Sequence, residues 1–223
     1  MKILIEKITP TEIEKKSMDI ISNELDKLNI TLDKEQAPVI KRVIHTSADF
    51  DYANNMYFSD KVIPKAIELL TNGTSIVTDT KMAQSGINKK AAEKLGINIY
   101  NFMSDNDIAD YAAKNNTTRS AACMDKAAAL KEPLIFAIGN APTALIRLYE
   151  LYKDGIFKPE LIIGVPVGFV NVIQAKELIM QTDVPCIIAK GRKGGSNIAA
   201  AICNALMYEI VWKNRNYRIF TIL

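Results

Sequence analysis

His45 is the only histidine among the 223 residues, so any reaction that requires an imidazole must use it. A single histidine excludes metal sites built from several imidazoles, including the H-E-x-x-H pattern. An imidazole exchanges protons near neutral pH, which makes His45 a candidate general acid or hydrogen-bond donor. From its position alone, a histidine that only sits at the end of a helix is the simpler alternative.

The three cysteines do not form a recognisable catalytic or structural set. Cys123, Cys186 and Cys203 are widely spaced, odd in number and without a C-x-x-C pair. This pattern encodes neither a disulfide framework nor a zinc site. We therefore expect three reduced core residues, no metal and a cytoplasmic location.

Polar and glycine-bearing segments follow five short apolar or β-branched runs, at 75–78, 97–100, 134–138, 161–165 and 186–189. If these runs are parallel strands, the segments after them lie at one edge of the sheet, where ligands of such sheets bind. A loop that opens onto a helix also exposes backbone N–H groups that suit anions. Glycine occurs at such turns in every α/β fold, so a purely structural role stays open.

Two further observations concern anions and nucleotides. Arg119 follows Thr118 at an expected helix start, where a guanidinium opposes the helix dipole. We expect either a carboxylate partner there or a solvated surface arginine. There is no G-x-G-x-x-G after the first strand and no G-x-x-x-x-G-K-[ST], so nucleotide cofactors fit poorly.

The elements that must position these residues alternate along the chain. Helical stretches of about 10 to 18 residues separate most of the apolar runs, which is the length that a parallel crossover needs. This predicts a three-layer α/β/α fold with a central, mostly parallel sheet of about five strands, plus N-terminal helices. We expect one domain over 1–223, with a helical segment at 1–58, an α/β core at 59–213 and a loose tail at 214–223.

The N-terminal segment predicts two helices. Thr11 is the expected N-cap of the first, and Glu14 completes a capping box. The second is expected to begin near Asp33, with Gln36 as the reciprocal cap and Pro38 in its first turn. The expected apolar face of the first helix contains Ile13, Ser17, Ile20, Ile21 and Leu25.

The amino-acid composition excludes several classes of protein. Hydrophobic residues make up 48% and charged residues 24%, and the 28 Lys+Arg exceed the 25 Asp+Glu by only three. These proportions exclude disordered and collagen-like chains. No Lys/Arg run suggests a nucleic-acid partner. The longest apolar stretch, at about 161–173, contains Gly164, Pro166 and Gly168 and is too short to cross a membrane. The N-terminus also lacks a secretory signal.

Six segments together resemble one family. They are 43–52 (VIHTSADFDY), 78–82 (TDTKM), 118–122 (TRSAA), 138–145 (IGNAPTAL), 164–170 (GVPVGFV) and 191–196 (GRKGGS). In this order they resemble the precorrin-8X methylmutases, also known as cobalt-precorrin-8 methylmutases. The resemblance runs from about residue 10 to about residue 210, and the segment from Asn214 departs from it.

The resemblance implies an isomerase of corrin-ring biosynthesis. Such an enzyme moves a methyl group from C11 to C12 of (cobalt-)precorrin-8, giving (cobalt-)hydrogenobyrinic acid or cobyrinate, and needs no cofactor. It implies that His45 protonates or hydrogen-bonds the ring, and that a homodimer binds the tetrapyrrole at an edge shared by its subunits. The expected substrate-binding residues are Ser17, Lys81, Met82, Thr118, Arg119, Ser120, Gly139, Asn140, Thr143, Gly164, Val167, Gly168, Arg192, Gly194 and Ser196.

The residues agree with this reaction on separate grounds. A methyl shift has no leaving group, so one proton donor and firm positioning suffice. Scattered cations and backbone N–H groups suit a polycarboxylate tetrapyrrole better than one basic patch does. Three alternatives stay open: a non-catalytic corrinoid carrier, an isomerase or methyl-transfer enzyme acting on a related tetrapyrrole, and a nucleotide-binding regulator. A Lys-, Ile- and Asn-rich composition favours the cobalt-containing route, but the sequence leaves the metal content of the substrate open.

Overall fold

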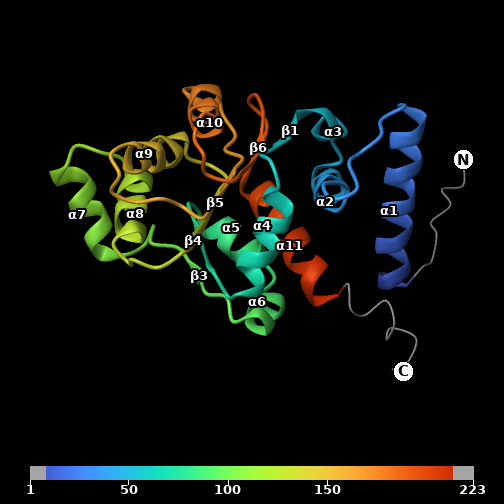
Figure 1. Ribbon diagram of the computed structural model, residues 1–223, viewed down its shortest axis with the longest axis horizontal. Coiled ribbons are helices and arrows are strands. Elements are labelled where there is room, and N and C mark those ends of the chain that lie inside the picture. Colours follow the sequence, from blue (N-terminus) through green and yellow to red (C-terminus); the bar gives the residue numbers. More distant parts are fainter. Residues whose placement is uncertain (1–8, 213–223) are drawn as a thin grey trace, which may run out of the picture.

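A six-stranded sheet lies at the centre of the protein, whose computed structural model describes residues 9–212. The strand order is β1-β6-β5-β4-β2-β3. Five strands are parallel: β2 (Ser75–Thr78), β3 (Ile99–Tyr100), β4 (Leu134–Ile138), β5 (Leu161–Gly164) and β6 (Cys186–Ala189). Helices cover both faces (Figure 1), which confirms the predicted three-layer α/β/α architecture.

The sixth strand corrects the expectation that 1–58 is entirely helical. β1 (Met56–Phe58) pairs antiparallel with β6, with Tyr57 opposite Ile188. Three half-buried residues are too few to display a period-2 pattern, so no sequence signal marked this edge strand. Two expected strands are also shorter than predicted, because β3 begins only at Ile99 and β5 ends at Gly164.

Helices divide between the two faces of the sheet. In chain order they are α1 (Pro10–Lys27), α2 (Ala37–Ser47), α3 (Tyr52–Asn55), α4 (Val62–Thr71), α5 (Lys81–Gly86), α6 (Lys89–Leu95), α7 (Asn106–Lys114), α8 (Arg119–Ala128), α9 (Pro142–Lys153), α10 (Val172–Met180) and α11 (Ser196–Val211). Helices α4, α5, α6 and α11 bury one face, and α7 to α10 bury the other. Within β4, Ile135 joins the first core and Phe136 the second, as strand alternation requires.

The N-terminal helix begins two residues earlier than predicted. Thr9, not Thr11, is the N-cap of α1, and its capping box partner is Glu12, which accepts from the Thr9 N–H at 2.9 Å. Pro10 then occupies the first helical position, where its missing N–H does no harm. Glu14, the expected partner of Thr11, instead pairs with Arg42 of α2 at 2.8 Å.

The second helix also differs at its start. Asp33 caps a turn by accepting from the N–H groups of Glu35 and Gln36, and the helix begins only at Ala37. Gln36 is therefore the N-cap by position, and its side chain makes no capping hydrogen bond. Pro38 lies in the first turn and His45 in the last, both as predicted.

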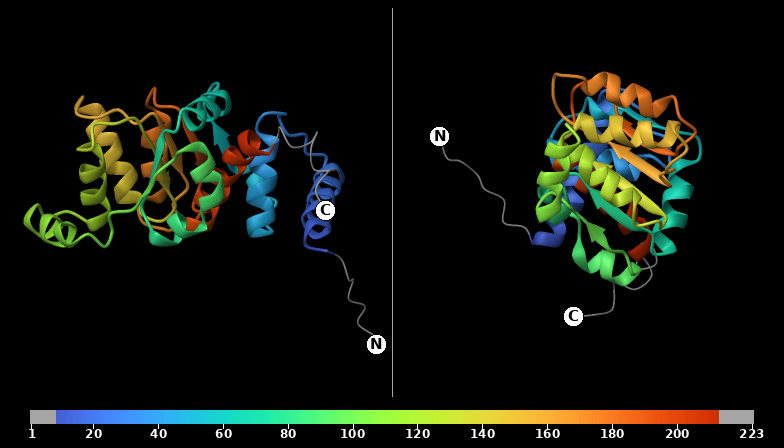
Figure 2. Two further views of the ribbon diagram at one scale, coloured as in Figure 1. Left: turned by 90° about the horizontal axis from the view of Figure 1, so that it is seen from below. Right: turned by 90° about the vertical axis from the view of Figure 1, so that its left-hand side faces the viewer.

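Helix α1 lies at one end of the molecule, beyond α2, whereas α7 lies at the opposite end (Figures 1 and 2). It packs against α2, and Ile21 and Leu25 are buried there. Ile13 and Ile20 were expected on the same buried face but are 48% and 50% exposed. Among the described residues α1 packs mainly against α2, so it buries a narrower stripe than the sequence pattern suggests.

The three cysteines are buried and unpaired, as expected. Burial raises the pKa of the Cys123 and Cys186 thiols to about 11.

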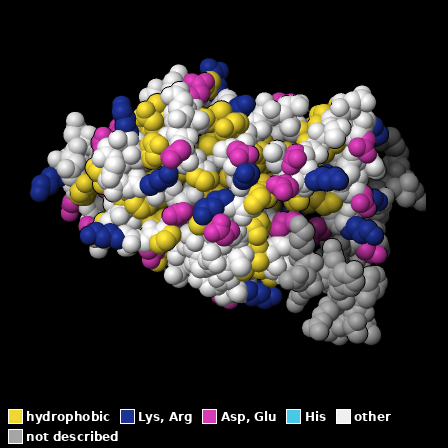
Figure 3. All heavy atoms as spheres, in the orientation of Figure 1, with side chains coloured by type: hydrophobic (Ala, Val, Ile, Leu, Met, Phe, Trp, Pro, Cys, Tyr) yellow, Lys and Arg dark blue, Asp and Glu magenta, His cyan; other side chains and the backbone are white. Residues whose placement is uncertain are grey.

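Among residues 9–212, no helix has the length and apolar character needed to span a bilayer. On the face drawn in Figure 3, side chains of both charge signs are interspersed. The predicted tail at 214–223 lies outside the described residues.

Candidate functional site

Asp79 joins two of the loops at the carboxyl edge of the sheet. It follows β2 directly, is 1% exposed, and its carboxylate accepts the backbone N–H groups of Gly139, Asn140 and Ala141 at 2.9, 2.8 and 2.7 Å. Burial raises the pKa of Asp79, whereas the three N–H donors oppose that rise. A buried carboxyl group is tolerated in this position because its oxygens are hydrogen-bonded.

This bridge narrows how the predicted substrate loop at 139–143 can act. The backbone N–H groups of Gly139 and Asn140 already bind Asp79. What the loop still offers is the exposed Asn140 side chain and the hydroxyl of Thr143, which accepts a hydrogen bond from Thr118 at 2.9 Å. The contact between Thr118 and Thr143 joins two of the segments that were expected to bind substrate.

The loop after β6 contacts the loops after β2 and β5. The hydroxyls of Thr80 and Ser196 lie 2.7 Å apart. The Gly168 N–H donates to the carbonyl of Arg192 at 3.2 Å, and the Gly195 N–H donates to the carbonyl of Val165 at 2.8 Å. The predicted glycine and polar loops therefore meet at one edge of the sheet, as parallel topology requires.

Two glycines are needed because backbones approach closely at this edge. A Cβ on Gly139 would lie 2.7 Å from the Cα of Ser196. Gly194 has φ +155°, and a Cβ there would collide with the carbonyl of Val165. Both positions therefore require glycine for packing, whatever else the loops bind.

His45 lies exposed in the last turn of α2 and lines a hollow of about 280 Å³. The walls come from α2, α5 and α11, and the residues lining the hollow are Arg42, His45, Thr46, Gly86, Asn197, Ala200, Ala201, Asn204 and Tyr208. Small residues on α5 and α11 leave space beside the imidazole. Asn197 follows Ser196 directly, so the hollow adjoins the loop after β6.

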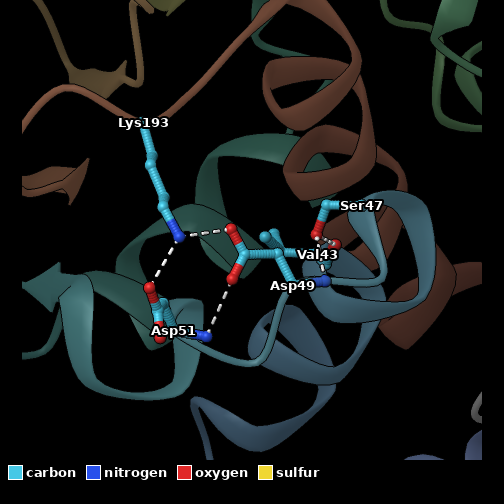
Figure 4. A network of polar contacts seen from close by, with 5 residues as sticks. All are labelled: Val43, Ser47, Asp49, Asp51 and Lys193. Carbon is cyan, nitrogen blue, oxygen red and sulfur yellow. Dashed lines mark hydrogen bonds and ion pairs between the residues drawn. The ribbon is translucent and has the colours of Figure 1, made fainter.

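An ion-pair cluster links that loop to the segment that follows His45. The ammonium of Lys193 lies 2.6 Å from a carboxylate oxygen of Asp49 and 2.6 Å from one of Asp51 (Figure 4). The Asp49 N–H donates to the hydroxyl of Ser47 at 3.2 Å, and that hydroxyl donates to the carbonyl of Val43 at 2.8 Å. The hydrogen bond from Lys193 holds the pKa of Asp49 below its ordinary value. Lys193 is thus engaged within the chain.

A second lysine, Lys176, binds the backbone of the same loop after β6. Lys176 of α10 is 1% exposed, and its ammonium donates to the carbonyls of Gly191 and Lys193 at 2.8 and 2.9 Å. Burial lowers the pKa of Lys176 to about 8. Buried lysines are rare and costly unless their donors are satisfied.

Two exposed arginines lie at the same edge. Arg119 begins α8, and among the described residues its side chain has no hydrogen-bond or ion-pair partner. The carboxylate partner that was one expectation for Arg119 is thus not found within residues 9–212. Arg192 lies over the ring of Phe169, 5.6 Å from its centroid. Both guanidinium groups face solvent and can receive an anion.

Apolar side chains are also exposed around these loops. Met82 is 71% exposed, Val167 47%, Phe169 83% and Val170 78%. Lys81 and Met82 are the first residues of α5. Exposed apolar groups beside cations suit a ligand or partner that is flat and apolar with charged margins.

One predicted residue lies apart from the others. Ser17 is on α1, where its hydroxyl donates to the carbonyl of Ile13 at 2.8 Å, and α1 lies beyond α2 from the sheet. Within one chain it does not join the loop cluster. Ser120 follows Arg119 in α8 and is half-buried, and Gly164 is the buried last residue of β5.

Sequence reasoning missed three groups that organise the site: Asp79, Lys176 and the Asp49–Asp51 pair as partners of Lys193. Asp79 carried a signal, because it is a charged residue directly after the buried strand β2. Lys176 carried another, because it shares a helical face with Val172, Ala175 and Ile179, all buried. The pairing of Lys193 carried none, since it joins distant segments.

The comparisons with known proteins agree with the motifs. The family model described as precorrin-8X methylmutase matches residues 12–209. A cobalt-precorrin-8 methylmutase from Priestia megaterium is 43% identical over 199 residues, covering 89% of this chain and 88% of that protein. A cobalt-precorrin-8 methylmutase from Salmonella typhimurium is 43% identical over 175 residues, covering 77% and 80%.

A solved structure agrees as well. The crystal structure of precorrin-8X methylmutase from Thermus thermophilus superposes with a TM-score of 0.79 at 31% identity, covering 88% of this chain and 96% of that one. The family-model match over residues 12–209 includes the loops at the carboxyl edge and the helix that bears His45. The chain therefore belongs to the precorrin-8X methylmutase family, as its six motifs indicated.

Proposed function

We propose that His45 is the general acid or hydrogen-bond donor of a methylmutase that moves a methyl group from C11 to C12 of precorrin-8. Membership of the family makes the chain an isomerase of corrin biosynthesis. The observation that carries the proposal for His45 is its place: the only imidazole of the sequence lines a hollow beside the converging loops.

Besides a proton or hydrogen-bond donor, the methyl shift requires few catalytic groups from the protein. The methyl group breaks its bond to one ring carbon and forms a bond to the next, so no external nucleophile or leaving group takes part. Protonation of the conjugated ring, or a hydrogen bond to it, withdraws electrons from the π-system as the methyl group migrates. Rigid placement of the ring against the imidazole supplies the rest of the rate enhancement.

Recognition of the substrate divides between charged and apolar groups. Arg119 and Arg192 are exposed guanidinium groups suited to acetate and propionate side chains of the macrocycle. The hydroxyls of Thr118, Ser120 and Ser196 extend this polar margin. The exposed side chains of Met82 and Val167 suit the ring face. Gly139, Gly164 and Gly168 support the proposal only through the shape of the backbone, because neighbouring atoms leave little room for a Cβ at these positions.

We further propose that the substrate carries cobalt. The two relatives at 43% identity are both named cobalt-precorrin-8 methylmutases. The Lys-, Ile- and Asn-rich composition of the chain favours the same route. The protein itself supplies no metal ion or organic cofactor in this scheme.

We also propose that the protein is a homodimer located in the cytoplasm. Phe169 and Val170 are 83% and 78% exposed, and Ile13 and Ile20 of α1 are half-exposed. Apolar surface of this kind is typical of a face that another subunit or a ligand covers. In a dimer, Ser17 of one subunit could reach the substrate of the other, which would account for its distance from the loops of its own chain.

The proposal is tested by mixing the purified protein with metal-free and with cobalt-containing precorrin-8 and recording visible spectra. Migration to C12 rearranges the conjugated system, so turnover changes the colour of the ring. We expect faster conversion of the cobalt-containing ring. Tight binding without conversion of either ring would instead favour the second candidate, a corrinoid carrier.

A further inference from the structure

Lys176 is an unusual residue for the buried face of α10. Its side chain is 1% exposed, and its polar partners within residues 9–212 are the carbonyls of Gly191 and Lys193. No carboxylate of the described chain forms an ion pair with it. A methionine or leucine would fill the same space without the cost of burying a charge. Packing alone therefore does not explain a lysine here.

The loop that Lys176 holds has little conformational preference of its own. Gly191, Gly194 and Gly195 all have positive φ, at +73°, +155° and +140°. Glycines fix no conformation, so outside contacts must select one. The ammonium binds the carbonyls on both sides of Arg192, while the carbonyl of Arg192 itself accepts from the Gly168 N–H. These contacts fix the backbone at Arg192 and Lys193, two of the cations of the loop.

The direction of the Lys193 side chain follows from this anchoring. With its carbonyl held by Lys176, Lys193 extends to Asp49 and Asp51, at 2.6 Å from each. Asp49 is hydrogen-bonded through Ser47 to Val43 (Figure 4). Val43 and His45 both lie in the last turns of α2. A continuous set of contacts thus runs from the buried face of α10 to the C-terminal end of α2, which bears the imidazole.

We propose that Lys176 is a positioning residue that holds the glycine loop so that Lys193 fixes the end of α2, and with it His45, against the sheet edge. The inference rests on the proposed role of His45 for its effect on turnover. The part of the inference that concerns the position of the imidazole does not rest on that role, because this position can be observed without substrate.

The test uses the fact that the sequence contains one histidine. The full-length protein, freed of any affinity tag, is labelled with ¹⁵N, and the imidazole signals of His45 are recorded for wild type, Lys176→Met and Lys193→Met. We expect both variants to displace the signals, and the double variant to displace them no further than Lys193→Met alone, because both act through one set of contacts. The matched control is Lys158→Met, which removes an ion pair with Asp183 at 2.7 Å away from the loop. It should leave the signals in place.

Turnover gives the second readout. Lys176→Met should lower kcat about tenfold to a hundredfold, because misplacement of a reacting group affects the chemical step. If Lys176→Met does not fold, Lys176→Ala is measured with propylammonium, which replaces the deleted atoms, and with 1-propanol as its control. Only the amine should restore the wild-type imidazole signals.

Three results would overturn the proposal. One is a folded Lys176→Met protein whose His45 signals match wild type while Lys193→Met displaces them. Another is additive displacement in the double variant. The third is failure of both Lys176 variants to fold even with the amine, which would assign Lys176 a global structural role. If the signals move as expected but wild type turns over no precorrin, the proposed function fails and the positioning role stands.

Discussion

The ammonium of Lys193 lies 2.6 Å from the carboxylate of Asp49, although 144 residues separate them in the sequence. This contact joins the glycine loop after β6 to the segment after His45. Because Lys193 holds the pKa of Asp49 below its ordinary value, the Asp49 carboxylate stays charged above the usual pH range for aspartate, and the ion pair is lost as the pH falls through the lowered pKa. At neutral pH the two segments are therefore connected.

The bridge from Asp79 to the loop after β4 predicts a large effect on stability. In Asp79→Asn, an amide NH₂ must face at least one of the N–H groups of Gly139, Asn140 and Ala141. We expect a loss of about 1–3 kcal/mol in the free energy of unfolding, because a buried donor is left without an acceptor. Urea denaturation measures it. The control is Asp154→Asn, at the exposed end of α9, and equal stability of the two variants would contradict the account.

Glycine is required at 194 but not to the same degree at 191. In Gly194→Ala the new methyl group meets the carbonyl of Val165, whereas a Cβ on Gly191 meets no atom within 4 Å. Both positions have positive φ, so each alanine variant should lose about 1–2 kcal/mol from backbone strain. Gly194→Ala should lose more, because the loop must also move away from Val165. Thermal unfolding of the pair tests this, and an equal fall in midpoint would show that the close approach is unimportant.

Arg119 predicts an effect on binding without an effect on folding. The guanidinium is exposed and has no partner among the described residues, so Arg119→Ala should leave the unfolding midpoint unchanged. Loss of one charge-assisted contact to a substrate carboxylate should raise KM by about tenfold. Lys114→Ala, at the exposed end of α7, is the matched control. An unchanged KM in Arg119→Ala would remove this residue from the substrate site.

Lys176 predicts a stability difference that depends on pH. Its pKa is about 8 in the folded protein against 10.5 for an ordinary lysine. Between these values the unfolded chain binds more protons, so the contribution of Lys176 to stability rises with pH and is lowest below pH 8. Relative to Lys176→Met, wild type should gain up to about 3 kcal/mol between pH 7.5 and 10.5. Urea titrations of both proteins check this, and a difference that stays constant with pH would mean that burial does not lower the pKa of Lys176.

The sequence was sufficient for the layers of the fold and for the edge at which the loops meet. β4 was predictable because all five of its residues are apolar and buried. β1 was not, because three half-buried residues carry no period. The start of α1 was ambiguous because Thr9–Glu12 and Thr11–Glu14 have the same capping-box spacing. Tertiary contact decides between them, since Glu14 binds Arg42.

The candidate site divides in the same way. Parallel topology alone predicts that the loops containing Thr80 and Ser196 meet, and their hydroxyls lie 2.7 Å apart. Topology cannot predict which N–H groups another side chain already occupies, as Asp79 does at Gly139. Nor can it predict that Lys193 is engaged by two carboxylates, because that depends on how α2 is placed against α11.

The role of His45 is tested most directly by single-turnover conversion of cobalt-containing precorrin-8, followed by its visible spectrum, in wild type and His45→Gln. Glutamine retains a hydrogen-bond donor but cannot transfer a proton at neutral pH. We predict conversion by wild type and a loss of about a hundredfold or more in His45→Gln, with substrate still bound. Full conversion by His45→Gln at the wild-type rate would contradict proton transfer by the imidazole.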